Sequence, residues 1–269
     1  MVRTACDSLG LKHGADSAKE KKFNMKYSII IPTYNHCNDL LIPCVESILR
    51  YSNLQDIELI ISANGCTDNT RDFLNSLQDY FKFYKCPDGL KVVWHDQALG
   101  YSRAVNAGIK VSTTNNILLL NNDTVLLPQN TNDWLFLLEH EFVKDPQCGI
   151  SGVHGLMSPF TNRMFVIFFC VLIKREVFDR LGLLNEAYGT GGGEDTEFCY
   201  EAEKLGYTVK IIENTYYPIY HEGEGTMHDG EMTNEDLVNL RIQNEARMAK
   251  KYNIEWYNQH FSHVHVSDE

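Results

Sequence analysis

The chain has 269 residues, enough for one large domain with a substantial buried core. Its formal net charge is -12 without a prominent basic cluster, which argues against a general nucleic-acid-binding protein because such proteins place positive charge opposite phosphates. The eight cysteines include no C-x-x-C pair, so we predict free thiols in a reducing compartment rather than a zinc or redox motif. The longest apolar segment, Met164 to Ile173, is about half as long as a membrane span, and no secretory h-region opens the chain. We expect no transmembrane segment and a location in the cytoplasm or at the periphery of a membrane.

Strands and helices are predicted to alternate in the first half of the chain. Residues 1–25 lack apolar periodicity and are predicted to form an N-terminal extension. Strands are predicted at Tyr27–Ile31, Ile57–Ile61, Lys91–Trp94 and Ile117–Leu120. Helices are predicted at Leu40–Tyr51, around Phe73 to Leu77, and at Ser102–Val111. This alternation is typical of βαβ units and therefore of a parallel sheet.

The second half of the chain has a less regular pattern. Helices are predicted at Trp134–Val143, Arg175–Leu181 and Thr196–Leu205, and strands at Met164–Ile173, Tyr207–Ile212 and Tyr216–Tyr220. Thr233 is predicted to cap a final helix that reaches Tyr252. Since there is no repeat and no low-complexity linker, we expect residues 26–232 to share one core, followed by a C-terminal helix and tail at residues 233–269.

The apolar strand Ile117–Leu120 is followed at once by Asn121, Asn122 and Asp123. In open α/β sheets ligands bind at the carboxyl ends of the strands, so Asp123 is placed where a metal or a substrate would lie. A hard divalent cation prefers oxygen ligands such as this carboxylate. The alternative is that Asp123 only caps the turn before Pro128.

A glycine-rich run, Gly189 to Gly193, leads into Glu194 and Asp195. The run matches neither G-x-G-x-x-G nor the P-loop, and its acids would repel phosphate. Adjacent residues at a helix start point in different directions, so we expect one of the two carboxylates to face a substrate. The amino end of a helix favours an ionised carboxylate, which suits a general base. The alternative is ordinary capping of the helix by acidic residues.

Two further positions have side chains suited to a diphosphate or a metal. His221 follows a predicted strand, and its imidazole could complete a metal shell or contact phosphate. It is not part of an H-E-x-x-H motif, because Gly225 occupies the second histidine position, and a structural role is the alternative. Arg103 and Asn106 lie near a helix start, where backbone N–H groups and a guanidinium could meet a diphosphate.

Five short segments occur in the order found in a known family. They are Ile29–Asn35, Ala63–Thr70, Leu99–Gly108, Leu120–Thr124, and Gly193–Asp195 with the helix that follows to Tyr207. Together they resemble the inverting nucleotide-sugar glycosyltransferases of family 2, over about Lys26 to Thr226. The resemblance implies an α/β GT-A (Rossmann-like) fold: a single domain with a mostly parallel central sheet flanked by helices. Residues 26–125 would then form the nucleotide-binding half and residues 126–232 the acceptor-side half.

The resemblance also implies a reaction and a set of site residues. The donor would be a nucleotide diphosphate sugar, with UDP favoured over GDP or dTDP, and the acceptor a glycan or glycoconjugate. Asp123 and His221 would hold Mn²⁺ or Mg²⁺ at the diphosphate, and Asp195, beside Glu194, would deprotonate the acceptor hydroxyl. The residues expected to contact the donor are Pro32, Thr33, Tyr34, Asn35, Asn64, Asp68, Arg103, Asn106, Asn121 and Asn122.

The sequence departs from the family pattern at two positions. Ala63 replaces the first Asp of the loop that often contacts the base, and Asn121 replaces the first Asp of the metal motif. These changes motivate one alternative, a catalytically silent protein that binds sugar nucleotides or glycans. The acidic pair Glu194 and Asp195 argues against it, because binding alone needs no base. A sugar nucleotidyltransferase is a second alternative, but the turn at Pro32–Asn35 lacks the glycine-rich basic loop of those enzymes.

Overall fold

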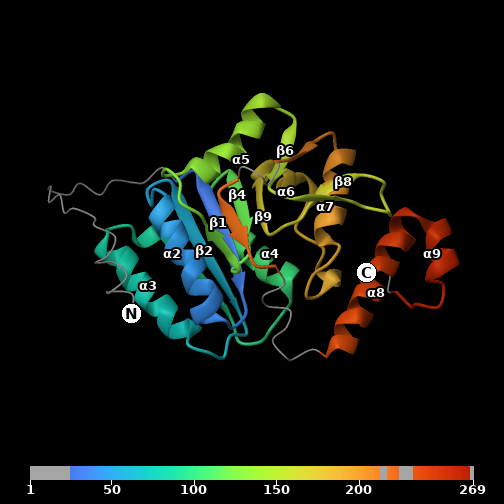
Figure 1. Cartoon of the computed structure of the whole chain (residues 1–269), viewed down its shortest axis with the longest axis horizontal. Helices are drawn as coiled ribbons and strands as arrows, with labels where there is room; N and C mark the ends of the chain where they lie inside the picture. The colour runs from blue at the N-terminus through green and yellow to red at the C-terminus, as the bar shows by residue number, and fades with distance from the viewer. Residues whose placement is uncertain (1–24, 213–216, 224–232, 267–269) are drawn as a thin grey trace.

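A computed structural model describes residues 25–212, 217–223 and 233–266. The predicted N-terminal extension, residues 1–25, lies outside this part of the chain except for Met25, as does the start of the strand predicted at Tyr216–Tyr220. A central sheet has helices against both of its faces, and the last two helices stand at one side of the molecule (Figure 1). The structure is therefore of the layered α/β type.

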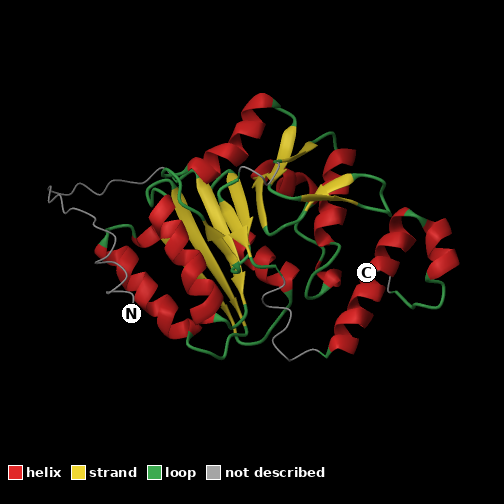
Figure 2. Ribbon diagram, in the orientation of Figure 1, coloured by secondary structure: helices red, strands yellow, loops and turns green. Residues whose placement is uncertain are grey.

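The central sheet has seven strands in the order β10-β6-β9-β4-β1-β2-β3. Figure 2 shows the strands in yellow and the helices in red. Their bounds are β1 (Tyr27–Thr33), β2 (Ile57–Asn64), β3 (Leu90–His95), β4 (Asn116–Leu120), β6 (Cys148–Gly152), β9 (Cys170–Lys174) and β10 (Thr208–Ile211). Strand β1 pairs in parallel with β2 and β4, β2 pairs in parallel with β3, and β10 with β6. Only β9 runs antiparallel to its neighbours in this sheet of the described chain, β4 and β6. The predicted mostly parallel α/β sheet is confirmed.

Alternate residues of β1 enter two different cores. Ile29 and Ile31 belong to a buried cluster with α2, α3 and α5, whereas Ile30 packs with Val105 and Ile109 of α4. The helices on the first face are α2 (Ile42–Tyr51), α3 (Thr70–Phe83) and α5 (Asp133–Lys144); those on the second face are α4 (Tyr101–Val111), α6 (Arg175–Leu181) and α7 (Glu194–Lys204). A strand buried on both faces has no polar face, which explains the unbroken apolar runs in the sequence.

Shorter elements connect and extend this core. A π-helical turn precedes α2 (Cys37–Leu41), and 3-10 turns occupy Pro87–Gly89 and Glu186–Tyr188. Two small sheets pair β5 (Thr124–Leu126) with β11 (Ile219–His221) and β7 (Gly155–Met157) with β8 (Met164–Val166). The chain continues through α8 (Asn234–Tyr252) and α9 (Ile254–His260). Among the described helices, none is both long enough and apolar enough to cross a membrane.

The prediction of one long strand at Met164–Ile173 is wrong. Strands β8 and β9 are separate, because residues 167–169 leave one sheet and enter the other. The N–H of Ile167 donates to the carbonyl of His154, and the carbonyl of Phe169 accepts from the N–H of Asn121 at 2.8 Å. These bonds satisfy the backbone while it changes partner strands, so an unbroken apolar run does not require an unbroken strand.

Strand β6 was not predicted, because glycines interrupt its apolar pattern. A Cβ atom at Gly152 would approach the Val166 side chain to 2.1 Å, and one at Gly149 would approach the Val177 side chain to 2.8 Å. The glycines therefore allow the strand to pack closely against its neighbours. Packing of this kind leaves no periodic signal in the sequence.

Helix α8 begins as predicted. The Thr233 side chain accepts from the N–H of Asp236, and the Asp236 side chain accepts from the N–H of Thr233, which forms a capping box. The helix then ends at Tyr252, where the sequence placed its end. The second half of α8 buries Asn244, Ala246, Met248 and Ala249. Helix α9, which follows it, was not predicted.

Candidate active site

The two residues predicted to hold a metal lie together at the carboxyl end of β4. Asp123 follows that strand, and the pairing of β5 with β11 sets Thr124 opposite His221. The Oδ1 atom of Asp123 is 3.2 Å from Nε2 of His221, and the Asp123 residue is only 6% exposed. The N–H of Glu222 donates to the carbonyl of Asp123 at 3.1 Å, which fixes the register of the two chain segments. Residues about 100 positions apart in the sequence thus form one small polar cluster.

This cluster fits a divalent cation that has further ligands from a substrate. Asp123 offers a carboxylate and His221 an imidazole nitrogen, and Mn²⁺ accepts both. The side-chain oxygen of Asn121 is also buried and accepts no hydrogen bond within the described residues. No group of three or more His, Cys, Asp and Glu side chains able to hold a metal occurs in the described part of the chain. A cation here would therefore depend on oxygens that a ligand supplies, such as those of a diphosphate.

The turns after β1 and β2 meet at the same edge of the sheet. The side-chain amide of Asn122 donates to the Thr33 hydroxyl at 3.0 Å, which joins the ends of β4 and β1. The Oδ1 atom of Asn35 accepts from the N–H groups of Thr67 and Asp68 at 2.8 and 3.3 Å. These predicted donor-contact residues therefore converge, together with Pro32 and Tyr34, the partly buried residues on either side of Thr33. The expected edge is present at the carboxyl ends of parallel strands.

Asp68 ties the second of these turns to the first. Its carboxylate accepts from the N–H of Cys37 at 2.9 Å and from the N–H of Thr70 at 3.1 Å. Burial alone would raise the pKa of Asp68, but the hydrogen bonds from Thr70 and Cys37 outweigh it and hold the pKa below its usual value. Asp68 is therefore ionised at neutral pH and holds the turn in place.

Ala63 replaces the first Asp of the loop that often contacts the base, and Asn64 is the polar residue next to it. Ala63 is fully buried and offers no polar group. The Oδ1 atom of Asn64 accepts from the N–H of Leu99 at 2.7 Å, and its amide donates to the carbonyl of Gly100 at 3.4 Å. Asn64 thus holds the loop that enters α4, next to the edge where a nucleotide would lie.

Arg103 and Asn106 connect α4 to the segment after α6. Asn106 is 1% exposed; its amide donates to the carbonyl of Leu184 at 2.9 Å, and its oxygen accepts from the N–H of the same residue at 3.0 Å. The Arg103 guanidinium lies 3.1 Å from the carboxylate of Glu186. Their polar groups are thus used within the fold, as are those of Asn35, Asn64, Asp68 and Asn122.

The glycine-rich run forms a tight loop that ends at the first residue of α7. Gly191, Gly192 and Gly193 have φ angles of 131°, 97° and 123°, which side-chain-bearing residues rarely adopt, and this explains the glycines. Glu194 is 6% exposed, and its Oε2 atom has no hydrogen-bond partner among the described residues. Asp195 is more accessible, and its Oδ1 atom accepts from the N–H of Thr196 at 2.6 Å.

The two carboxyl groups of this pair ionise in sequence. Burial raises the pKa of Glu194 well above its usual value, and the charge of Asp195 raises it further. Burial also raises the pKa of Asp195, but hydrogen bonds from Thr196 and from the backbone of Phe168 oppose the effect. Asp195 therefore loses its proton first, while Glu194 keeps one. Of the two carboxyl groups, Asp195 is thus the better proton acceptor at neutral pH.

Tyr101, which the sequence patterns did not single out, is hydrogen-bonded to the segment before β9. Its hydroxyl donates to the carbonyl of Phe168 at 2.7 Å. Burial raises its pKa well above the usual value, and the charges of Glu194, Asp195 and Asp123 add to the shift. The next residue, Phe169, accepts through its carbonyl from the N–H of Asn121 at 2.8 Å, and the Phe168 backbone is hydrogen-bonded to Asp195, so residues 168–169 contact both clusters. The feature of the sequence that could have identified Tyr101 is its position directly after Gly100, near the start of a predicted helix.

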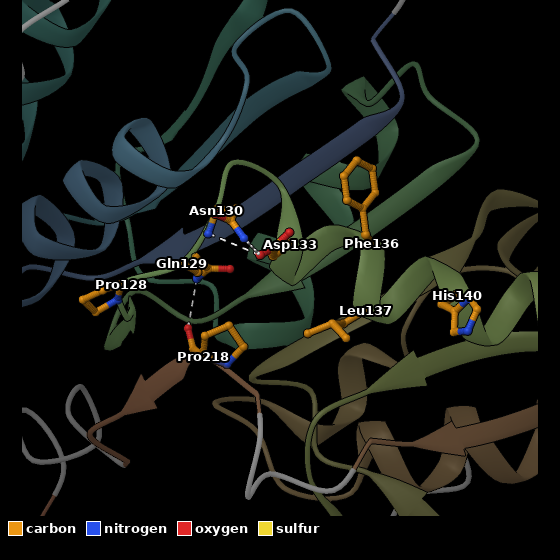
Figure 3. A pocket seen from close by; sticks show the side chains of 8 residues that line it. All are labelled: Pro128, Gln129, Asn130, Asp133, Phe136, Leu137, His140 and Pro218. Atoms are coloured by element: carbon orange, nitrogen blue, oxygen red, sulfur yellow. Dashed lines mark hydrogen bonds between the residues drawn. The ribbon is translucent and has the colours of Figure 1, made fainter.

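A surface pocket of about 600 Å³ lies elsewhere, at the start of α5 (Figure 3). Its lining residues are Pro128, Gln129, Asn130, Asp133, Phe136, Leu137, His140 and Pro218. The Asn130 amide donates to Asp133 at 2.8 Å, and the Gln129 amide donates to the carbonyl of Pro218 at 3.1 Å. The pocket shares no residue with the site described above.

The fold and the site define the class of protein. The structure is similar to that of the mannosyltransferase PcManGT from Pyrobaculum calidifontis, solved in complex with GDP-Man and Mn²⁺, with a TM-score of 0.62 and 17% sequence identity over 93% of this chain and 69% of the other. The chain has the GT-A glycosyltransferase fold. Residues 28–143 match the family described as Glycosyl transferase family 2. The resemblance inferred from the five segments is confirmed.

Two relatives extend the comparison. The uncharacterized protein y4gI of Sinorhizobium fredii is 26% identical over 75% of this chain, and the chain spans only 25% of that protein. The UDP-Glc:alpha-D-GlcNAc-diphosphoundecaprenol beta-1,3-glucosyltransferase WfaP of Escherichia coli is 23% identical over 72% of this chain and 77% of its own length. The chain thus spans a quarter of the first relative and most of the second.

Proposed function

We propose that the protein is an inverting glycosyltransferase that moves a sugar from a nucleotide diphosphate sugar to a hydroxyl group of a glycan or glycoconjugate. The observation that carries the proposal is that residues 168–169 contact both parts of the site: the Phe169 carbonyl accepts from the N–H of Asn121 at 2.8 Å, and the Phe168 backbone is hydrogen-bonded to Asp195. Transfer of a sugar from a diphosphate to a hydroxyl requires a group that stabilises the leaving diphosphate, such as a metal ion, and a base that accepts the proton of the hydroxyl.

In the proposed reaction Asp195 is the base. Its carboxylate accepts the proton of the acceptor hydroxyl while the oxygen forms a bond to the anomeric carbon. The bond from that carbon to the diphosphate oxygen breaks at the same time, and the electron pair leaves with the nucleoside diphosphate. Attack opposite to the leaving group inverts the anomeric configuration. Glu194, which holds its proton, keeps the local charge low so that Asp195 can stay ionised.

The residues at the strand ends would bind the donor. Asp123 and His221 would hold Mn²⁺ or Mg²⁺, which when bound supplies positive charge to the leaving diphosphate. Pro32, Thr33, Tyr34 and Asn35 shape the turn against the nucleotide, and their network with Asn122 and Asp68 keeps that turn rigid. The contacts of Asn64 leave it at the entrance to α4, beside the expected base position.

A UDP-sugar is the proposed donor class. The WfaP relative, most of whose length the chain covers, carries UDP-Glc in its name. The structural neighbour PcManGT was solved with GDP-Man, so GDP-sugars are the competing class, with dTDP-sugars as a third. Free thiols at the seven described cysteines agree with the reducing cytoplasmic location expected from the sequence.

A donor screen tests the proposal. The protein would be incubated with UDP-, GDP- and dTDP-sugars and Mn²⁺, with and without a chelator, and nucleoside diphosphate release would be measured together with the anomeric configuration of any product. Release that depends on the cation supports the transferase. Pyrophosphate release from a nucleoside triphosphate and a sugar phosphate would instead identify a sugar nucleotidyltransferase. Donor binding by calorimetry without any turnover would identify a silent binding protein.

A further inference from the structure

The loop that carries the catalytic carboxylates is held by a side chain from the far end of the chain. Asn244 lies in the second half of α8 and is 3% exposed. Its side-chain amide donates to the carbonyl of Tyr188 at 3.2 Å and to the carbonyl of Gly191 at 3.0 Å. One buried amide thus supplies donors to two carbonyls of a loop whose glycine backbone has little stiffness of its own.

The held loop is in direct contact with the start of α7. The ring of Tyr188 packs against Gly193 so closely that a Cβ atom there would approach the ring to 2.5 Å. The Tyr188 hydroxyl donates to Glu197 of α7 at 2.6 Å, and Lys251 of α8 lies 3.1 Å from the same carboxylate. A displacement of Tyr188 would therefore reach Gly193, the residue directly before Glu194.

The opposite side of the loop is fixed by α4. The N–H of Tyr101 donates to the carbonyl of Gly189 at 3.1 Å. A Cβ atom at Gly100 would approach the same carbonyl to 2.3 Å, so the backbones touch. The loop is thus held between the helix that carries Tyr101 and the helix that carries Asn244. Of these two contacts, the one from Asn244 is made by a side chain and can be removed by substitution.

We propose that Asn244 is a positioning residue for the transfer reaction, because it fixes the glycine-rich loop and so sets the direction of the Asp195 and Glu194 carboxylates. The inference rests on the proposed function, and it extends that function to the C-terminal helix, which lies outside the family match at residues 28–143. Misplacing a reacting group by about 1 Å can cost on the order of a hundredfold in rate, so loss of the amide is expected to lower kcat.

The test uses the full chain with Asn244→Asp, an isosteric change that removes both donated hydrogen bonds. Asn244→Ser, which can donate one bond, is the partial rescue, and Gln243→Ala is the matched control at the neighbouring exposed position of α8. We expect kcat for Asn244→Asp to fall by roughly 10- to 100-fold. The donor KM should stay within about twofold, because the donor contacts lie on other segments. The serine variant should fall between wild type and Asn244→Asp, and the control should match wild type.

Hydrogen–deuterium exchange provides a readout that does not depend on activity. Peptides that cover residues 188–193 should exchange faster in Asn244→Asp, while peptides from β1 and β4 should not. If Asn244→Asp melts like wild type and keeps both kcat and loop protection, the inference is overturned. If Asn244→Asp does not fold, wild-type kcat and loop protection in Asn244→Ala would overturn it equally. If the wild-type protein is inactive but the loop exchanges faster in Asn244→Asp, the proposed function is refuted and the role of Asn244 in holding the loop is supported.

Discussion

The imidazole of His221 lies parallel to the ring of Phe169, with the centroids 4.0 Å apart and the planes inclined by 10°. Phe169 is 4% exposed, so the stack forms a fixed wall behind the histidine. Because the ring blocks rotation of the imidazole, Nε2 is kept near Asp123. The residue that orients the proposed metal ligand thus comes from the segment that enters β9.

Replacing Phe169 with Leu is expected to weaken Mn²⁺ binding roughly tenfold, since supporting contacts of metal ligands typically have effects of this size. The leucine preserves apolar volume but removes the flat surface. Calorimetric titration of Mn²⁺ in the presence of the nucleoside diphosphate product would measure the change. Tyr220→Ala, at the exposed position next to His221, is the control. Unchanged Mn²⁺ affinity in the Phe169 variant would show that the stack does not orient the histidine.

Asp195→Asn is expected to lower kcat by about 10²- to 10⁴-fold, the range associated with loss of a general base. Donor affinity should be retained, because the amide has the same size and Asp195 is assigned to the acceptor. Initial rates and donor titrations would separate the two effects. Glu176→Gln, an exposed change on α6, serves as the control. Wild-type turnover in Asp195→Asn would remove the base assignment.

The rate should rise with pH as Asp195 loses its proton, with a midpoint near its raised pKa of about 6. The hydroxyl of Thr196 donates to Asp195 at 3.3 Å and favours the ionised form. Thr196→Val keeps the shape but removes this donor, so the midpoint should move to higher pH. Profiles of kcat against pH would show it, with Thr190→Val in the preceding loop as the control. A midpoint that stays the same or moves down would contradict the assignment.

Glu194→Gln is expected to change how stability depends on pH. The pKa of Glu194 is raised to about 8 in the folded protein from an ordinary value near 4.5, so the folded state binds the proton more tightly than the unfolded state. This contribution is complete below pH 4.5 and is lost as pH rises toward 8. Glutamine does not titrate, so the variant should lose less stability over this range. Urea unfolding at pH 5 and pH 8 would measure the slopes, and equal slopes would refute the shift.

Asn106→Ala should destabilise the fold by about 2 kcal/mol, because both backbone groups of Leu184 would lose a buried partner. Arg103→Ala, which breaks an exposed ion pair with Glu186, should cost less than about 1 kcal/mol. Donor affinity should remain near wild type in both. Chemical denaturation and donor titration would measure these effects. A loss of donor affinity at unchanged stability would return either residue to the donor site.

The sequence predicted the strands that carry the donor edge because each is a compact apolar run followed by polar residues. Strands β1, β2 and β4 continue one to three residues past or before the predicted bounds, but their polar ends are where the motifs placed them. The capping box at Thr233 was readable for the same reason: its signal lies within four residues. Local patterns therefore identified the fold and most of the edge.

Contacts between distant segments were not readable. The pairing of β5 with β11 brings His221 to Asp123. Strand β11 overlaps the strand predicted at Tyr216–Tyr220, but β5 was not predicted and no local pattern pairs the two. Tyr101 was missed because the carboxylates whose charges raise its pKa lie on other segments of the chain. Asn106 was expected at the diphosphate because its motif is shared with the family, whereas its hydrogen bonds go to Leu184. Such roles depend on packing, which a single sequence does not encode locally.

The antiparallel direction of β9 couples the two sides of the candidate site. Because β9 runs antiparallel to β4, residues 167–169, which precede β9, lie at the sheet edge where the parallel strands have their carboxyl ends. This one tripeptide supplies the carbonyl that holds Tyr101, a backbone hydrogen bond to Asp195, and the ring behind His221. Two of these contacts are made by backbone atoms and the third by the Phe169 ring. A shift of this short backbone segment would therefore alter the proposed donor side and the proposed acceptor side in the same step.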